Sequence, residues 1–176
     1  MRMRLTAVML LAGLVSACGF HLAGSRSLPE ALQQVYIQTQ LPYAVDEPPL
    51  EIALRSRLRR RGADVTGSIG SAATVLRLTQ LEETREVLSV GADGKALEFQ
   101  LTTQVTYVLL RDGVPALPSY TQSVTRDYSF NAQQVLAKEA EEARLRRFIQ
   151  DELAELVLLR LETLLANQPG QPVATN

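Results

Sequence analysis

Apolar and polar residues alternate most regularly between positions 97 and 109. The odd positions carry Leu, Phe, Val and Tyr, with Thr103 as the exception, and the even positions up to 106 carry Glu, Gln and Thr. This period of two predicts a strand with one buried face and one wet face. A similar alternation over 120–130 predicts a second strand, although Gln122 and Arg126 fall on its mainly apolar side.

Further strands and two turns complete the predicted sheet. Residues 35–37 form a short β-rich run, and residues 73–82 and 86–90 predict a strand that is either straight or bent. Asp93-Gly94 and Asp112-Gly113 are turn signals of the hairpin type. The wet strand faces are rich in Gln, Thr and Ser, which is typical either of an exposed sheet or of a surface that receives sugars or lines a protein's interior.

Two helices are predicted from spacing and end signals. The first begins near Pro49 or Leu50, carries leucines every four residues and ends at Gly62. The second falls within residues 132–166, which contain no Gly or Pro. We therefore expect an α+β fold, a two-layer sandwich in which an antiparallel or mixed four-stranded sheet has two helices packed on one face.

Residues 1–17 have the layout of a secretory signal peptide. Arg2 and Arg4 precede an apolar run over 5–15, and small residues follow. A helix over that run would span only about 16 Å, roughly half of the hydrocarbon core of a bilayer. A permanent membrane helix is therefore not expected here.

The single cysteine follows these small residues directly. Val15-Ser16-Ala17-Cys18 resembles the lipobox of bacterial lipoproteins, in which the signal is cut before a cysteine that then carries acyl chains. By the same resemblance, Gly19 in place of Asp favours transport to the outer membrane. We expect Cys18 to be the lipid anchor; the alternative is an ordinary signal peptide followed by an unrelated thiol. The expected organisation is a lipidated tether over 18–32, an α+β domain over 33–166 and a disordered tail over 167–176.

Composition argues against most enzyme classes. The chain has 18 Lys+Arg and 19 Asp+Glu, a formal net charge of −1, so it lacks the basic excess of a general nucleic-acid binder. One cysteine and one histidine exclude a disulfide framework, a multi-cysteine zinc site and a HExxH metalloprotease. No catalytic constellation or phosphate loop is recognisable. We expect a protein that is not an enzyme and holds no metal or cofactor.

Three features stand out from this background. The end of the first helix carries an arginine cluster, which indicates either contacts to phosphates or an acidic partner, or solvated cations that suit a helix C-terminus. The end of the second helix is apolar on nearly every side, which indicates a partner surface or packing against the first helix. Lys95 and Lys138 are the only lysines. The arginine cluster comprises Arg55, Arg57, Arg59, Arg60 and Arg61.

Several short motifs occur together in one order. They are Cys18-Gly19-Phe20-His21-Leu22, then Leu28-Pro29, Leu54-Arg55-Ser56-Arg57-Leu58, Asp93-Gly94 and Val135-Leu136-Ala137-Lys138. This series resembles the LptE family of lipopolysaccharide-assembly lipoproteins over most of residues 18–165. The opening motif is distinctive beside the lipobox, whereas each later motif is weak by itself.

The resemblance implies a non-enzymatic outer-membrane lipoprotein that faces the periplasm and lies inside the lumen of the LptD β-barrel. It also implies that the protein supports barrel assembly, binds lipopolysaccharide and aids its delivery to the outer leaflet. The family's lipopolysaccharide-contacting lysine corresponds to Lys138. A family basic residue before the hairpin turn corresponds to Ala92, so that contact is missing, and Lys95 is the candidate replacement. The alternatives are an auxiliary lipoprotein of another envelope lipid transporter and a lipid-anchored hydrolase.

Overall fold

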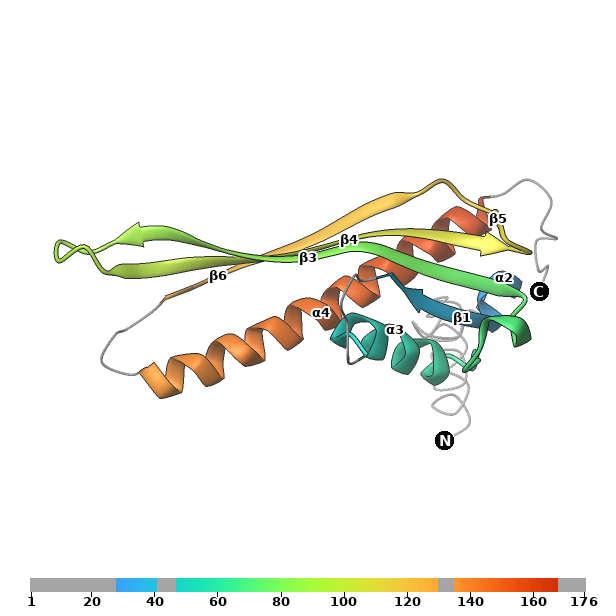
Figure 1. Ribbon diagram of the computed structural model, residues 1–176, viewed down its shortest axis with the longest axis horizontal. Helices are drawn as coiled ribbons and strands as arrows, with labels where there is room; N and C mark the ends of the chain where they lie inside the picture. Colours follow the sequence, from blue (N-terminus) through green and yellow to red (C-terminus); the bar gives the residue numbers. More distant parts are fainter. Residues whose placement is uncertain (1–27, 41–46, 130–134, 168–176) are drawn as a thin grey trace, which may run out of the picture.

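The computed structural model describes residues 28–40, 47–129 and 135–167. The predicted signal peptide, Cys18 and the predicted tail beyond Asn167 therefore lie outside the described residues. The chain runs through the following elements (Figure 1): α2 (Glu30–Gln33), β1 (Gln34–Thr39), α3 (Pro49–Arg60), β2 (Asp64–Val65), the 3-10 turn η1 (Ile69–Ser71), β3 (Thr74–Val90), β4 (Ala96–Arg111), β5 (Val114–Pro115), β6 (Tyr120–Ser129) and α4 (Val135–Ala166).

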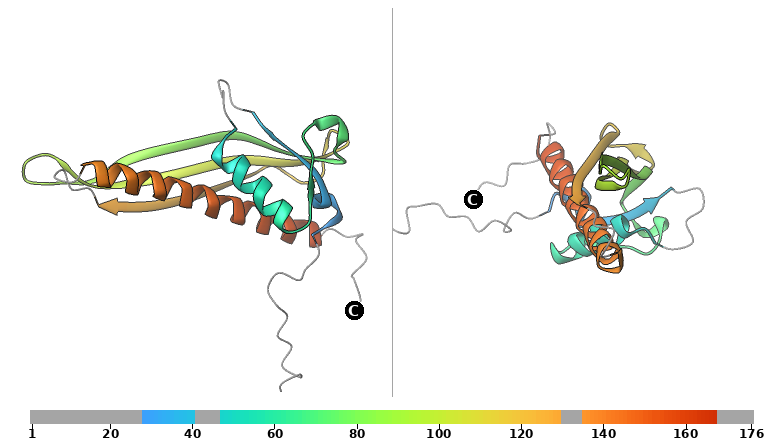
Figure 2. Two further views of the ribbon diagram at one scale, coloured as in Figure 1. Left: turned by 90° about the horizontal axis from the view of Figure 1, so that it is seen from below. Right: turned by 90° about the vertical axis from the view of Figure 1, so that its left-hand side faces the viewer.

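A long antiparallel hairpin gives the molecule its elongated shape. β3 and β4 pair over nearly their whole length, and β6 pairs with β4 from Glu98 to Tyr107. Sixteen residues of β4 span about 54 Å at the usual rise of a strand. β1 pairs with β3 only near the start of β3, so the outer half of the sheet has three strands. The body therefore narrows toward the hairpin (Figures 1 and 2).

The sheet is mixed, as expected, but has six strands rather than four. Its order is β2-β1-β3-β4-β5, with β6 also paired to β4. The two additional strands, β2 and β5, contain two residues each, which is too short for an alternation to be visible in the sequence. Both α3 and α4 cover the same side of the sheet, and no helix among the described residues covers the other side (Figures 1 and 2).

The two predicted segments 73–82 and 86–90 form a single strand with an irregularity. The register of β3 against β4 shifts between Thr79 and Glu82, and Gln80 has a positive φ of 49°. A bulge inserts an extra residue, so the side chains that follow it change face. Leu76 and Leu78 are buried before the bulge, whereas Glu83 contacts α4 after it.

The apolar core fills the broad end of the molecule. Leucines of α3 and α4 pack there against β1, β3 and β4. The apolar end of α4 packs largely into this core, because Val157, Leu158, Leu161 and Leu165 are all buried. Packing between α3 and α4 therefore explains most of the apolar excess that the sequence shows. Leu159, at 54% exposure, is the exception.

The folded domain begins earlier than predicted. Leu28, Ala31 and Leu32 are buried in the main core, and the amide of Leu32 donates to the carbonyl oxygen of Pro29 at 2.8 Å. Residues 28–32 therefore belong to the α+β domain and not to the tether. Because α2 is only four residues long and shows no periodicity, no pattern in the sequence marks it.

Candidate functional site

The two lysines singled out from the sequence lie toward the same end of the molecule. Lys95 follows Gly94 in the loop between β3 and β4, and Lys138 lies in the first turn of α4. Figure 1 shows the hairpin loop and the start of α4 toward the same end of the molecule, with the hairpin extending beyond the helix. Two residues that are far apart in the sequence thus occupy two neighbouring arms of the fold.

Each of these lysines is paired with a nearby carboxylate. The Nζ of Lys95 lies 3.1 Å from Asp93, and the Lys95 side chain is 68% exposed. A hydrogen bond from the Lys95 amide, together with the Lys95 ammonium, lowers the pKa of Asp93. The Nζ of Lys138 lies 2.6 Å from Glu141, and its side chain is only 16% exposed. An incoming phosphate would have to displace these carboxylates.

Arg144 is a nearby cation that the sequence analysis did not single out. Together with Glu141, Leu145 and Phe148 it lines a shallow depression on α4. Its Nε donates to the carbonyl oxygen of Ala140 at 3.4 Å, and among the described residues it has no carboxylate partner. In the sequence it looks like any other solvated helix residue, so no pattern marks it.

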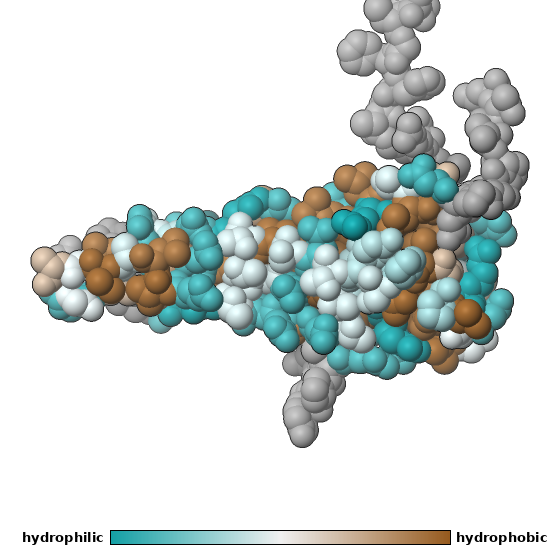
Figure 3. All heavy atoms as spheres, turned by 90° about the horizontal axis from the view of Figure 1, so that it is seen from above, coloured by the Kyte–Doolittle hydropathy of each residue, from teal (hydrophilic) through white to brown (hydrophobic). Residues whose placement is uncertain are grey.

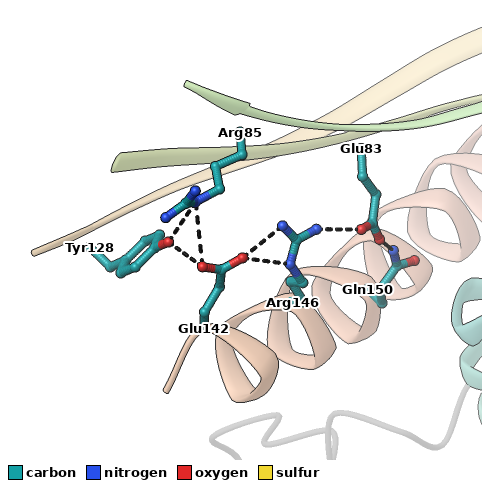
Figure 4. Close-up of polar contacts among 6 residues, drawn as sticks. All are labelled: Glu83, Arg85, Tyr128, Glu142, Arg146 and Gln150. Atoms are coloured by element: carbon teal, nitrogen blue, oxygen red, sulfur yellow. Dashed lines mark hydrogen bonds and ion pairs between the residues drawn. The ribbon is translucent and has the colours of Figure 1, made fainter. Parts of the chain in front are cut away.

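A polar network joins the first half of α4 to the sheet (Figure 4). Arg146 of α4 contacts Glu142 at 2.8 Å and Glu83 of β3 at 2.7 Å. Glu142 also accepts from Tyr128 of β6 and lies 3.4 Å from Arg85 of β3. The Arg85 guanidinium in turn stacks 3.5 Å from the centre of the Phe99 ring. Gln150 of α4 completes the network by donating to Glu83.

The network changes the proton affinity of its members. Burial alone would raise the pKa of Glu142, but hydrogen bonds from Tyr128 and Arg146 and the charge of Arg85 outweigh it, so the pKa lies below its ordinary value. Burial and the hydrogen bond to Glu142 raise the pKa of the Tyr128 hydroxyl. Glu142 is therefore ionised and Tyr128 neutral at physiological pH. This role is structural, because every charge in the network has a partner of opposite sign.

Arg126, which falls on the apolar side of β6, is explained by a second link to α4. Its guanidinium forms an ion pair with Glu152 and lies 5.8 Å from the centre of the Phe148 ring. Gln122, the other polar residue on that side, is partly exposed. The two polar residues on the apolar side of β6, Gln122 and Arg126, thus lie at the margin of the layer between α4 and the sheet.

Ion pairs occupy much of the arginine cluster. Arg57 of α3 and Arg61, which directly follows α3, contact Glu155 of α4, each at 2.7 Å, and Arg61 also pairs with Glu162. Arg55 pairs with Glu47 and Glu51. Arg59 donates to the carbonyl oxygen of Val65, and Arg60 to the hydroxyl of Ser56. Within the described residues, Arg59 and Arg60 are therefore the members of the cluster without a carboxylate partner. The cluster lies at the broad end, beside the part of α4 that is remote from Lys138.

Within the described residues, no group of three or more His, Cys, Asp and Glu side chains is arranged to hold a metal ion. No helix in the same part of the chain combines the length and the apolar character needed to cross a membrane.

Comparison with known proteins identifies the family. A family model described as "LptE: Lipopolysaccharide-assembly" matches residues 32–161. The chain belongs to the LptE family. It is similar to the LPS-assembly lipoprotein LptE of Photorhabdus laumondii, with 32% identity over 167 residues that cover 93% of this chain and 88% of that relative. The LPS-assembly lipoprotein LptE of Pectobacterium atrosepticum is 32% identical over 171 residues, which cover 96% and 90% of the two chains.

Solved structures share this LptE-family fold. The solution structure of lipoprotein B from Nitrosomonas europaea has a TM-score of 0.68 at 24% identity and covers 85% of this chain and 94% of its own. The crystal structure of the rare lipoprotein B from Shewanella oneidensis has a TM-score of 0.61 at 22% identity, with coverage of 76% and 97%. The α+β arrangement with a mixed sheet is therefore one that solved lipoproteins also adopt.

Proposed function

We propose that this LptE-family chain is a non-enzymatic outer-membrane lipoprotein that occupies the lumen of an LptD-type β-barrel. In this role it supports assembly of the barrel, binds lipopolysaccharide and aids its delivery to the outer leaflet. Family membership and the names of the two relatives, which are both LPS-assembly lipoproteins, support the assembly role. Occupation of a barrel lumen and direct binding of lipopolysaccharide go beyond what the family description and these names state.

The observation that carries the barrel role is the long, narrow body. β4 alone spans about 54 Å, more than the roughly 40–45 Å thickness of a bilayer with its headgroups. Beyond β1 the sheet is three strands wide, about 15 Å, and one helix covers it. Such a body suits the lumen of a large outer-membrane barrel, which is polar inside and can hold a plug.

The first described residue after the proposed anchor and the two lysines lie toward opposite ends of this body. Leu28, the first described residue after Cys18, packs in the core at the broad end, whereas Lys95 and Lys138 lie toward the narrow end (Figure 1). If acyl chains on Cys18 hold the broad end at the inner leaflet, the narrow end projects into the barrel. This polarity would carry the lysines away from the periplasm.

The proposed lipopolysaccharide contacts are Lys138 and Lys95. An ammonium group attracts a phosphate as a point charge, and it can exchange one anionic partner for another. Lys95 is well exposed, so its exchange of Asp93 for a phosphate needs little rearrangement. Lys138 is largely covered and would have to turn away from Glu141. Arg59 and Arg60 are the members of the arginine cluster best placed for a separate phosphate or acidic partner.

Copurification tests the proposal. The full-length chain, with an affinity tag after its last residue, is produced in a two-membrane bacterium that carries the chain's own LptD-type protein, and the membranes are extracted in mild detergent. Mass spectrometry of the eluate should identify the barrel in a stoichiometric complex. Capture of an inner-membrane lipid transporter instead would favour an auxiliary lipoprotein of a different pathway, and recovery of neither would remove the barrel role.

A further inference from the structure

No described part of the chain forms a layer over the face of the sheet opposite α4. Side chains that point to this face form rows across the strands, because β3, β4 and β6 are paired in register. One row joins Thr84, Thr102 and Thr125, and the next joins Glu86, Gln100 and Asp127. Figure 3 looks onto this face and shows polar side chains over the middle of the rod, with apolar ones gathered at its narrow tip and broad end.

Hydrogen bonds between neighbouring strands hold these rows in place. The hydroxyls of Thr102 and Thr125 lie 3.0 Å apart. Gln100 donates to Asp127 at 2.9 Å. The hydroxyls of Thr106 and Thr121 lie 2.9 Å apart. The face is therefore a fixed array of donors and acceptors whose side chains have already lost part of their rotational freedom, which lowers the entropic cost of docking.

From Glu82 to the hairpin, along the facing part of β4 and along β6, every charge that the described residues place on this face is negative. Arg77, which lies before the bulge and donates to Gln38 of β1, is a cation on the same face nearer the broad end. Four acidic side chains point outward, and the only basic residues in the same stretches, Arg85 and Arg126, point to the opposite side and pair with Glu142 and Glu152 of α4. The outward acidic residues are Glu82, Glu86, Glu98 and Asp127. Glu82 and Glu86 are exposed and have no hydrogen bond or ion pair with any described residue. The side facing α4 is thus neutralised, whereas the uncovered side is not.

We propose that the uncovered face of β3 beyond its bulge, together with that of β4 and β6, docks against a protein surface that carries Arg or Lys side chains among hydrogen-bonding groups. This inference rests on the proposed function, in which the surface is one sector of the barrel's inner wall. A basic sector would neutralise Glu82 and Glu86 and would meet the Thr, Gln and Ser side chains with hydrogen bonds. Lipopolysaccharide is excluded from this face because its phosphates would meet the four carboxylates. The lipid then passes on another side of the molecule.

The test reverses charge on one face and compares it with an equal reversal elsewhere. The double variant Glu82→Lys/Glu86→Lys is made in the full-length tagged chain. The control is Glu139→Lys/Asp151→Lys on α4, since both residues are exposed and have no partner among the described residues. Each pair shifts the net charge by the same amount. The melting temperature of each purified variant is measured, and neither pair should change it, because none of the four side chains has a hydrogen bond or ion pair within the described residues.

The experiment compares how much barrel each form recovers, and how lipopolysaccharide binds to each. We expect the sheet variant to recover at least about tenfold less barrel than the wild type, while the control recovers the wild-type amount, because like charges across an interface are unfavourable. A photo-reactive amino acid at Gln104 should also crosslink to the barrel. Equal recovery by all three forms, together with no crosslink from Gln104, overturns the inference and leaves the proposed function standing. Weaker lipopolysaccharide binding by the sheet variant with unchanged barrel recovery also overturns it. If even the wild type recovers no barrel, the proposed function itself fails and takes the inference with it.

Discussion

The guanidinium of Arg146 on α4 lies 2.7 Å from the carboxylate of Glu83 on β3, although 63 positions separate the two residues. The leucines of α3 and of the end of α4 form the core at the broad end of the molecule. This ion pair lies outside that end, toward the hairpin. It ties the first half of α4 to the hairpin with polar contacts. The relative position of the arms that carry Lys138 and Lys95 therefore depends partly on charge.

Replacing Arg146 should loosen this attachment. Arg146→Met leaves Glu83 and Glu142 without their shared partner, and we expect a loss of about 1–2 kcal/mol in the free energy of unfolding, because the site is partly exposed and screened. The control is Arg144→Met, which removes a guanidinium without a carboxylate partner and should change stability by less than about 0.5 kcal/mol. Urea denaturation measures both. Equal losses in the two variants would contradict a structural role of the network.

Stability should fall on acidification through Glu142. Its pKa in the folded protein lies below the ordinary value of 4.5. The stabilisation is therefore fully present above about pH 5 and is lost as the pH falls through the lowered pKa of the folded state. Glu142→Gln should be less stable at pH 7 and should lose less additional stability between roughly pH 5 and pH 3 than the wild type. Thermal unfolding over this range checks it, with the exposed Glu139→Gln as control; parallel curves for Glu142→Gln and the wild type would contradict the prediction.

Packing of α3 on α4 should depend more on leucines than on the ion pairs around Glu155. Glu155→Gln breaks the contacts to Arg57 and Arg61. We expect it to cost less than about 1 kcal/mol, and less still at high salt, because these side chains are partly exposed. Leu153 is fully buried, so Leu153→Ala should cost about 2–5 kcal/mol. Chemical denaturation at low and high salt separates the two effects. A larger loss in the free energy of unfolding from Glu155→Gln than from Leu153→Ala would contradict this prediction.

The lysines can be tested one at a time. Lys138→Asp should weaken binding of lipopolysaccharide to the purified protein by roughly tenfold, since a charge-assisted contact to phosphate is replaced by repulsion. The fold should tolerate the change, because an acidic residue in the first turn of a helix is favourable. Lys138→Arg keeps the charge and should retain most of the binding. Unchanged binding by Lys138→Asp, measured by calorimetry, would count against Lys138.

The same measurement on Lys95→Asp asks whether the hairpin has kept a contact despite Ala92. We expect a smaller loss than for Lys138→Asp, because the Lys95 side chain is 68% exposed and its interactions are screened by solvent. Gly94, with a φ of 78°, is left unchanged so that the turn is preserved. Binding equal to that of the wild type would assign the hairpin no part in lipid recognition.

The sequence by itself determined the long strands, the turns between them and the two main helices. Alternation along β4 and leucine spacing in α3 depend only on near neighbours, so they are readable before the chain folds. The motifs from Cys18 to Lys138 also pointed to the LptE family, which the comparisons confirm. The two-residue strands β2 and β5 and the short α2 were missed, because such segments are held by their neighbours and not by their own periodicity.

Only the tertiary structure decided which charges are neutralised and which face stays open. Arg57 meets Glu155 across 98 positions and Arg126 meets Glu152 across 26, and no local pattern encodes such distances. The bulge at Gln80 turns Glu83 toward α4 and leaves Glu82 on the opposite side. A charge acts over a few ångströms of space. Its partner is therefore set by how the layers pack, and the order of residues along the chain does not reveal it.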